Sequence, residues 1–187
     1  MTHRIARLGL VLFATLVVGL PASARAAFDP RAARMERSEA LFLEQLFEVS
    51  DEASRDNLAA ASWLRSGGRE GLHFEVYRER VVRTIQLLET LEAPERVEEV
   101  LGLVVAAVRD QRDFFADWYQ ALEEGRAFES QLTSEYGYHE GLHDSQRRLL
   151  EVYGRLLALF PREGEGNRRA FHEQLCALDL ACGGAGR

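Results

Sequence analysis

The sequence lacks the features that mark several common classes of protein. None of its 23 basic residues is lysine, and it has two cysteines and four prolines in 187 residues. A C-x-x-C-H motif is absent, which excludes a c-type cytochrome. A G-x-S-x-G motif is also absent, so there is little support for a nucleophilic serine. After residue 28 no run alternates between apolar and polar residues, so no strand is predicted and we expect an all-α protein.

The N-terminal residues have the pattern of a secretory signal peptide. Arg4 and Arg7 form a short basic start, and residues 8–20 form an apolar run too short to span a bilayer. Small residues follow and offer cleavage sites after Ala24 or Ala26. We therefore expect an exported protein, periplasmic or secreted, with no stable membrane anchor after cleavage.

The remaining chain, residues 27–187, is expected to form a single helical-bundle domain. Removal of residues 1–26 takes away three Arg and no acidic residue. The remaining 20 Arg stand against 30 Asp and Glu, and the formal net charge falls from −7 to −10. Nucleic acids and anionic membranes bind basic patches, so we exclude nucleic acid as a partner.

Apolar residues recur at steps of three and four along four long segments and one short one, as in amphipathic helices. Short connections between them favour an up-down-up-down four-helix bundle, with the short fifth helix folded back as a cap over one end. The second segment is expected to place Phe74, Tyr77, Val81, Ile85 and Leu88 inward, with His73 on the same side, and the short fifth segment Phe171, Leu175 and Leu178. The inward stripe of the fourth segment is placed on Leu132, Tyr136, His139, His143, Gln146 and Leu150. The predicted helices span residues 30–65, 70–91, 94–125, 127–160 and a short segment capped by Asn167.

The tetrapeptide Glu-Gly-Leu-His occurs twice, at residues 70–73 and 140–143. Glu-x-x-His places a carboxylate and an imidazole about 60° apart around a helix, so both can bind one ion. Two such motifs on two helices resemble the ferritin-like di-iron proteins, in which two further helices each supply a carboxylate. The candidate ligands for iron or a divalent metal ion are Glu70, His73, His139, Glu140 and His143.

The other two walls of such a site have weaker candidates. Asp56 lies on the first helix and Gln111 on the third, whereas Asp110, Asp113 and Asp117 lie off the apolar stripe. We prefer the simpler interpretation, in which the histidines are structural and hydrogen-bond to neighbouring polar side chains.

Two further cofactor hypotheses use the same residues. Residues 139–143 also spell His-Glu-x-x-His, which resembles the zinc-binding helix of metalloproteases. A third zinc ligand would have to come from Glu163, Glu165 or His172. Non-covalent haem, held by His73 with His139 or His143, is the other alternative.

The two cysteines, Cys176 and Cys182, are expected to form a disulfide in an exported protein. Six residues of continuous helix rise about 9 Å, which is farther than a disulfide spans. The helix that contains Cys176 must therefore end before Cys182.

The aromatic run at residues 114–119 covers more than one face of its helix. We interpret it mainly as core, with a face near Trp118 as the candidate surface for a protein partner. The sequence thus favours an exported, non-enzymatic binding or interaction module of unknown specific activity. A metal-binding bundle is the alternative.

Overall fold

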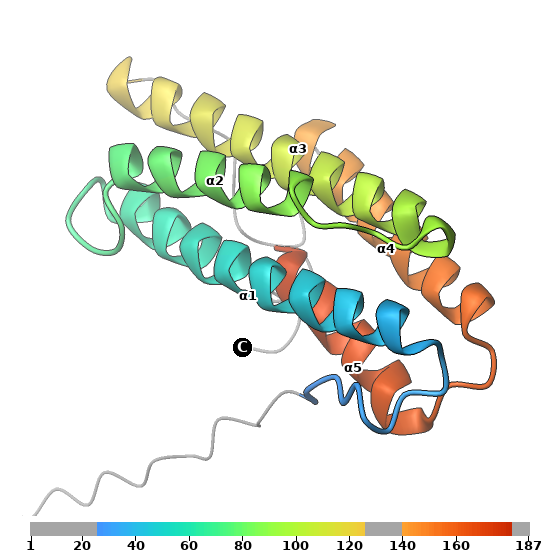
Figure 1. Ribbon diagram of the computed structural model, residues 1–187. Coiled ribbons are helices and arrows are strands. Elements are labelled where there is room, and N and C mark those ends of the chain that lie inside the picture. The colour runs from blue at the N-terminus through green and yellow to red at the C-terminus, as the bar shows by residue number, and fades with distance from the viewer. Residues whose placement is uncertain (1–25, 126–139, 181–187) are drawn as a thin grey trace, which may run out of the picture.

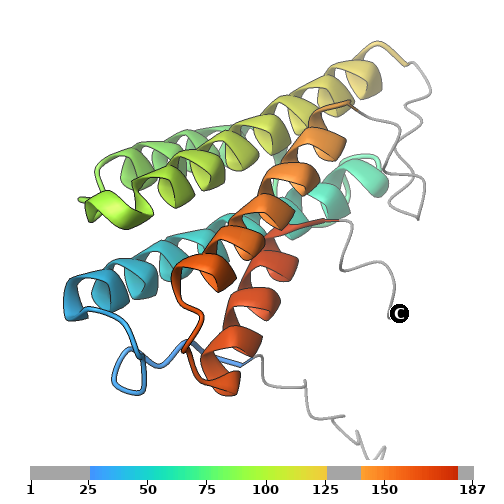
Figure 2. The ribbon, with the colours of Figure 1, turned by 90° about the vertical axis from the view of Figure 1, so that its right-hand side faces the viewer.

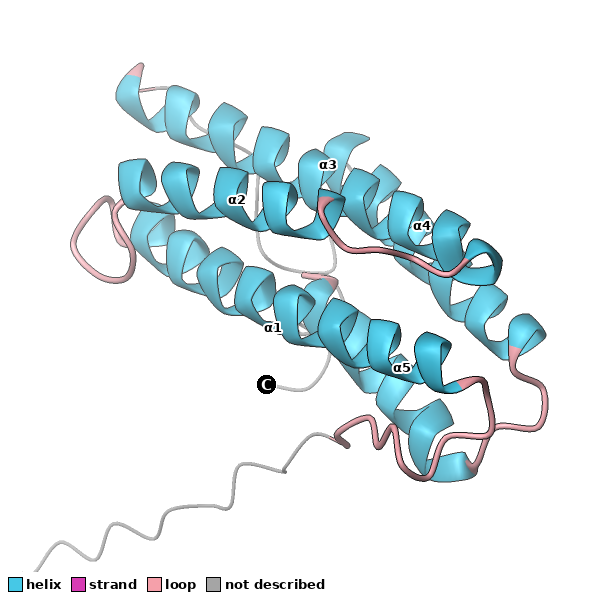
Figure 3. Ribbon diagram, viewed as in Figure 1, coloured by secondary structure: helices cyan, strands magenta, loops and turns pink. Residues whose placement is uncertain are grey.

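The computed structural model describes residues 26–125 and 140–180, and in this part of the chain helices are joined by loops, with no strand (Figures 1 and 3). The all-α prediction is therefore confirmed. Within these residues no helix is long and apolar enough to cross a membrane. The elements are α1 (Arg37–Arg65), α2 (Phe74–Glu89), the 3₁₀ turn η1 (Glu95–Val97), α3 (Glu98–Glu123), α4 (Glu140–Leu159) and α5 (Glu165–Leu178).

The helices pack in a closed series, α1 on α2, α2 on α3, α3 on α4, α4 on α5 and α5 on α1, with α1 also touching α3. Figure 2 shows α4 and α5 in front of α1, α2 and α3 and inclined to them. The apolar faces predicted for α2 and α5 are confirmed, because every inward residue named by periodicity is buried. These residues are Phe74, Tyr77, Val81, Ile85 and Leu88 on α2, and Phe171, Leu175 and Leu178 on α5.

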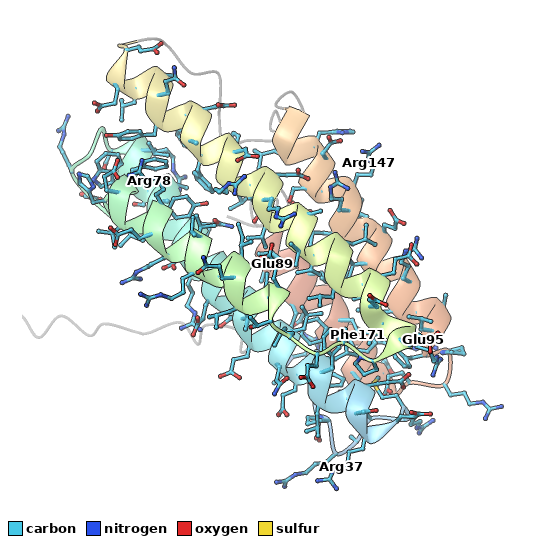
Figure 4. All side chains as sticks on the ribbon, turned by 45° about the horizontal axis from the view of Figure 1, so that its top comes forward. Arg37, Arg78, Glu89, Glu95, Arg147 and Phe171 are labelled. Carbon is cyan, nitrogen blue, oxygen red and sulfur yellow. The ribbon has the colours of Figure 1, made fainter. Side chains whose placement is uncertain are left out.

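The prediction that the fifth helix caps one end of the bundle is wrong. The Phe171 ring lies 5.9 Å from that of Phe47, and further along both helices Ser54 donates to the Ala177 carbonyl at 2.5 Å. α5 therefore runs along α1 in the same direction, and Figure 4 shows Phe171 on its inner side. Its apolar face needs burial along its whole length, which an end position would not provide.

The segment before α1 is not helical, although helix was predicted from residue 30. Phe28 is buried and stacks on Phe171 at 5.7 Å between ring centroids. The N–H of Asp29 donates to the Asn167 amide oxygen at 2.9 Å, and the Asn167 amide donates back to the Asp29 carbonyl at 3.1 Å. Asn167 therefore holds this segment against α5. It is not the N-cap of α5, as predicted from the sequence, because the N-cap is Gly164.

The predicted stripe of α4 is rotated by one residue from the buried one. His143 is exposed and Leu150 is 62% exposed, whereas Leu149 is buried. α4 packs between α3 and α5, and the stripe that faces both is one position out of phase with the stripe that contains the histidines. The buried positions of α4 are Leu142, Ser145, Leu149, Val152 and Leu156.

The aromatic run of α3 is core. Trp118 is only 7% exposed, and Phe114 and Phe115 are fully buried. α3 lies between α2 and α4 and also touches α1, so Phe114, Phe115 and Trp118 are buried although they lie on adjacent faces of the helix. The prediction of a partner surface at Trp118 is therefore wrong.

Candidate functional site

A chain of buried polar side chains crosses the core and joins all five described α-helices. The Tyr77 hydroxyl on α2 donates to the Asn57 amide oxygen on α1 at 2.9 Å, and the Asn57 amide donates to Gln111 on α3 at 2.7 Å. The Gln111 amide in turn donates to the Ser145 hydroxyl on α4 at 2.9 Å and to the Leu178 carbonyl at the end of α5 at 2.8 Å. Each of these polar groups has its partner within the protein, so this layer acts as a structural cross-link.

This layer also supplies a hydrogen bond to the last turn of α5 and keeps the Tyr77 hydroxyl protonated. The carbonyls at a helix C-terminus have no partner in their own helix. Here Gln111 and Ser54 donate to two of them, those of Leu178 and Ala177. Burial, reinforced by the nearby Asp56 carboxylate, raises the pKa of Tyr77 well above its ordinary value, so its hydroxyl stays a donor at neutral pH.

The first Glu-x-x-His motif was expected inside a helix, but it lies in the loop between α1 and α2. Glu70 and His73 are both exposed. His73 is the N-cap of α2: its Nδ1 accepts from the Glu75 N–H at 3.2 Å, and its ring lies 4.9 Å from that of Trp63. The prediction that His73 points into the bundle is therefore wrong.

This loop is held against α1 by backbone contacts. The Leu72 N–H donates to the Ala59 carbonyl at 3.1 Å. Gly71 has a φ of +98°, and a Cβ there would lie against the Ala59 carbonyl and 2.7 Å from the Trp63 nitrogen. Gly71, the glycine of the first Glu-Gly-Leu-His copy, is therefore required by its positive φ and by the close approach of the loop to the α1 backbone.

The second motif opens α4, and its His143 is exposed in the first turn of the helix. His139 and the side chain of Glu140 lie outside the described residues. α2 and α4 do not pack extensively on each other, since both pack on α3. In the described part of the chain no three His, Cys, Asp or Glu side chains lie close enough to hold a metal ion. The five-residue metal set stays a prediction.

The two auxiliary candidates have other roles. Asp56 is half-buried and accepts from the Arg80 guanidinium at 3.0 Å. Gln111 is 1% exposed and belongs to the core layer described above. Sequence periodicity correctly placed Gln111 inside the bundle, but its partners are Asn57, Ser145 and the α5 backbone.

The third ligands considered for zinc lie far from His143. Glu163 and Glu165 follow the other end of α4, and 16 helical residues between His143 and Leu159 span about 24 Å. The buried Glu163 side chain accepts from the Arg34 N–H at 2.8 Å and from the Asn167 amide at 3.1 Å. His172 is exposed beside Tyr153, ten residues and about 15 Å along α4 from His143. None of Glu163, Glu165 and His172 can therefore bind a zinc ion together with His143, and the metalloprotease hypothesis with these third ligands is wrong.

Cys176 lies in the last turns of α5, and Cys182 lies outside the described residues. α5 ends at Leu178, and Asp179 is extended, with φ −77° and ψ 107°. The condition that the helix must end between the two cysteines is met, and their pairing stays a prediction.

A surface groove of about 430 Å³ lies between the outer faces of α1 and α2. α1 contributes Glu52, Arg55 and Asp56, and α2 contributes Arg80, Arg83, Thr84 and Leu87. Two of the three arginines are already paired within the protein. Arg80 bonds to Asp56, and Arg55 bonds to Asp51 at 3.0 Å.

Two opposite charges of the groove are unpaired among the described residues. Arg83 on α2 and Glu52 on α1 are exposed and make no ion pair or hydrogen bond there. Thr84 is 4% exposed, and its side chain makes no hydrogen bond in this part of the structure. The groove therefore offers a cation and a hydroxyl on one wall, an anion on the other, and Leu87, which is 43% exposed, as an apolar contact.

Comparisons with protein-family models, curated proteins and solved structures found no match for this chain.

Of the groove residues, only Asp56 was a candidate from the sequence, and there as a metal ligand. Arg80, Arg83 and Leu87 follow at steps of three and four on the polar side of a helix whose opposite side is apolar. A solvated charged face gives the same pattern. Only the packing of α2 beside α1 brings Arg83 and Thr84 to the same groove as Glu52.

Proposed function

We propose that this chain is an exported protein, periplasmic or secreted, that acts as a non-enzymatic binding module through the groove between α1 and α2. We interpret the arrangement of its four long helices as an up-down-up-down bundle to which α5 is added. Export is supported by the signal-peptide pattern of residues 1–26.

The single observation that supports the binding site is the pair of opposite charges, Arg83 and Glu52, that line one groove and have no partner in the described part of the chain. Exposed arginines of this protein are commonly paired with a carboxylate, as in Arg78 with Glu75 and Arg147 with Asp144. Figure 4 labels these two arginines, on α2 and α4. Arg83 has no such partner among the described residues, and it lines the groove. A concave site with a few converging polar groups is the usual place for a ligand.

The alternative is a metal-binding bundle that uses Glu70, His73, His139, Glu140 and His143. The observation in its favour is the repeated Glu-Gly-Leu-His tetrapeptide. His73 and His143 are both exposed, so a metal ion bound by them would lie at the surface.

Both proposals are tested on the protein expressed as the full chain and isolated from the periplasmic or secreted fraction without chelators. Native mass spectrometry gives the start of the mature chain and the mass of any bound molecule, and elemental analysis gives the metal content. We expect a chain that starts after Ala24 or Ala26 and a bound species that Arg83→Glu removes. Arg78→Glu, on the same helix but outside the groove, should retain it.

Other results would contradict one proposal or the other. A chain retained in the cytosol with residues 1–24 intact contradicts export. A bound species that survives Arg83→Glu contradicts the groove as its site. Near-stoichiometric metal that disappears in the His73→Gln and His143→Gln double variant would establish the metal-binding alternative.

A further inference from the structure

We propose that the groove between α1 and α2 binds a small zwitterionic ligand of the amino-acid class with an apolar side chain. This inference rests on the proposed function and names the chemistry of its ligand. The ligand carboxylate binds Arg83 and the Thr84 hydroxyl, the ammonium binds Glu52, and the apolar side chain contacts Leu87.

The residues that would bind the ligand carboxylate, Arg83 and Thr84, lie on α2. A guanidinium and a hydroxyl are both hydrogen-bond donors, and together they match the two oxygens of a carboxylate. Thr84 is almost fully buried at the groove wall and Arg83 is exposed, so the two donors reach the same ligand group from different depths.

The residue that would bind the ligand ammonium, Glu52, lies on α1. Glu52, on the opposite wall, has no partner within residues 26–125 and 140–180, while the other acidic lining residue, Asp56, is neutralised by Arg80. A ligand with only negative charge would meet Arg83 favourably but would be repelled by Glu52. A zwitterion places one charge against each wall and leaves neither side chain unpaired.

The size and the apolar contact limit the ligand further. The groove volume of about 430 Å³ lies within the range of small-molecule sites. Leu87 is a large apolar side chain left 43% exposed at this groove, and its burial by an apolar ligand group is favourable. Leucine is therefore a suitable probe for the class.

The test is a titration of the ¹⁵N-labelled mature protein with L-leucine, followed by NMR chemical shifts. The comparison ligands are 4-methylpentanoate, which keeps the carboxylate, and 3-methylbutylamine, which keeps the amine. The dipeptide Leu-Leu distinguishes a free amino acid from a peptide as the source of the zwitterion. We expect leucine to shift residues 52–56 and 80–87 and to bind at least tenfold more tightly than either single-charge analogue.

Charge variants test each end separately. Arg83→Gln should weaken leucine binding about tenfold and leave the amine unaffected or bound more tightly. Glu52→Gln should weaken leucine binding but strengthen binding of 4-methylpentanoate, because it removes the repulsion. The matched controls are Arg78→Gln and Glu44→Gln, which lie on the same two helices outside the groove and should change nothing.

The possible failures are distinguishable. No localised shift at about 10 mM leucine or Leu-Leu overturns the ligand class. Equal weakening by the control variants overturns the site. If leucine fails while native mass spectrometry still finds a species removed by Arg83→Glu, the ligand class alone falls. If both measurements fail, the proposed function falls with it.

Discussion

The amide of Asn57 donates a 2.7 Å hydrogen bond to the amide oxygen of Gln111, and both side chains are only 1% exposed. The pair joins α1 to α3 at the centre of the molecule, and Gln111 continues the connection to α4 and α5. Three buried groups, on Asn57, Ser145 and Leu178, therefore depend on one side chain. Such a layer specifies the arrangement of helices as well as stabilising it, because an alternative packing would leave several polar groups buried without partners.

Replacement of Gln111 by Ala should lower the free energy of unfolding by about 2–4 kcal/mol, because it leaves buried polar groups unsatisfied and opens a cavity. Urea denaturation measures the loss. Gln120→Ala on the exposed side of the same helix should cost less than about 0.5 kcal/mol. A loss below about 1 kcal/mol for Gln111→Ala would show that water replaces these bonds.

Tyr77 makes stability depend on pH at the alkaline end. Its folded pKa is raised above the ordinary value of 10.0, chiefly by burial, so the stability it contributes is present below pH 10 and is lost as pH rises above 10. Tyr77→Phe should cost about 1 kcal/mol at neutral pH through the lost hydrogen bond, and should flatten the alkaline decline. Tyr153→Phe serves as the control and should retain the decline. The measurement is the urea midpoint between pH 8 and 11.

Gly71 should resist substitution far more than Gly67 in the same loop. Both have positive φ, but a Cβ at Gly71 would meet the α1 backbone, whereas a Cβ at Gly67 meets nothing within 4 Å. Gly67→Ala should cost about 1 kcal/mol, and Gly71→Ala about 2–4 kcal/mol because the loop must also move away from α1. Equal costs in thermal unfolding would contradict the close approach of this loop to Ala59.

Adjacent leucines of α4 test its rotation. Leu149 is 2% exposed and Leu150 is 62% exposed. Leu149→Ala should cost about 2–4 kcal/mol, because it removes buried apolar surface and leaves a cavity. Leu150→Ala should cost less than about 1 kcal/mol. If chemical denaturation showed a larger loss of stability for Leu150→Ala than for Leu149→Ala, the buried face of α4 would be the predicted one that contains His143.

The predicted disulfide of Cys176 and Cys182 closes a short loop at the end of α5. The denatured, non-reduced protein should show no free thiol and should run as a monomer. Reduction should lower stability by about 2 kcal/mol, the value for a loop of this length. Free thiols, or a dimer that disappears on reduction, would contradict an intrachain bridge.

The sequence by itself determined the helical class and the inward faces of α2 and α5, because an unambiguous apolar period of three and four residues leaves one face to bury. It also placed Gln111 inside the bundle. The face of α4 was decided by tertiary structure, because neighbouring leucines at 149 and 150 and at 156 and 157 give two apolar stripes, and only packing against α3 and α5 selects one. The groove was likewise a tertiary outcome: Glu52 and Arg83 are 31 positions apart in the sequence, and the turn at Gly71 brings their helices side by side. Periodicity reports which face of a helix is apolar, whereas which neighbours cover that face depends on contacts between distant segments.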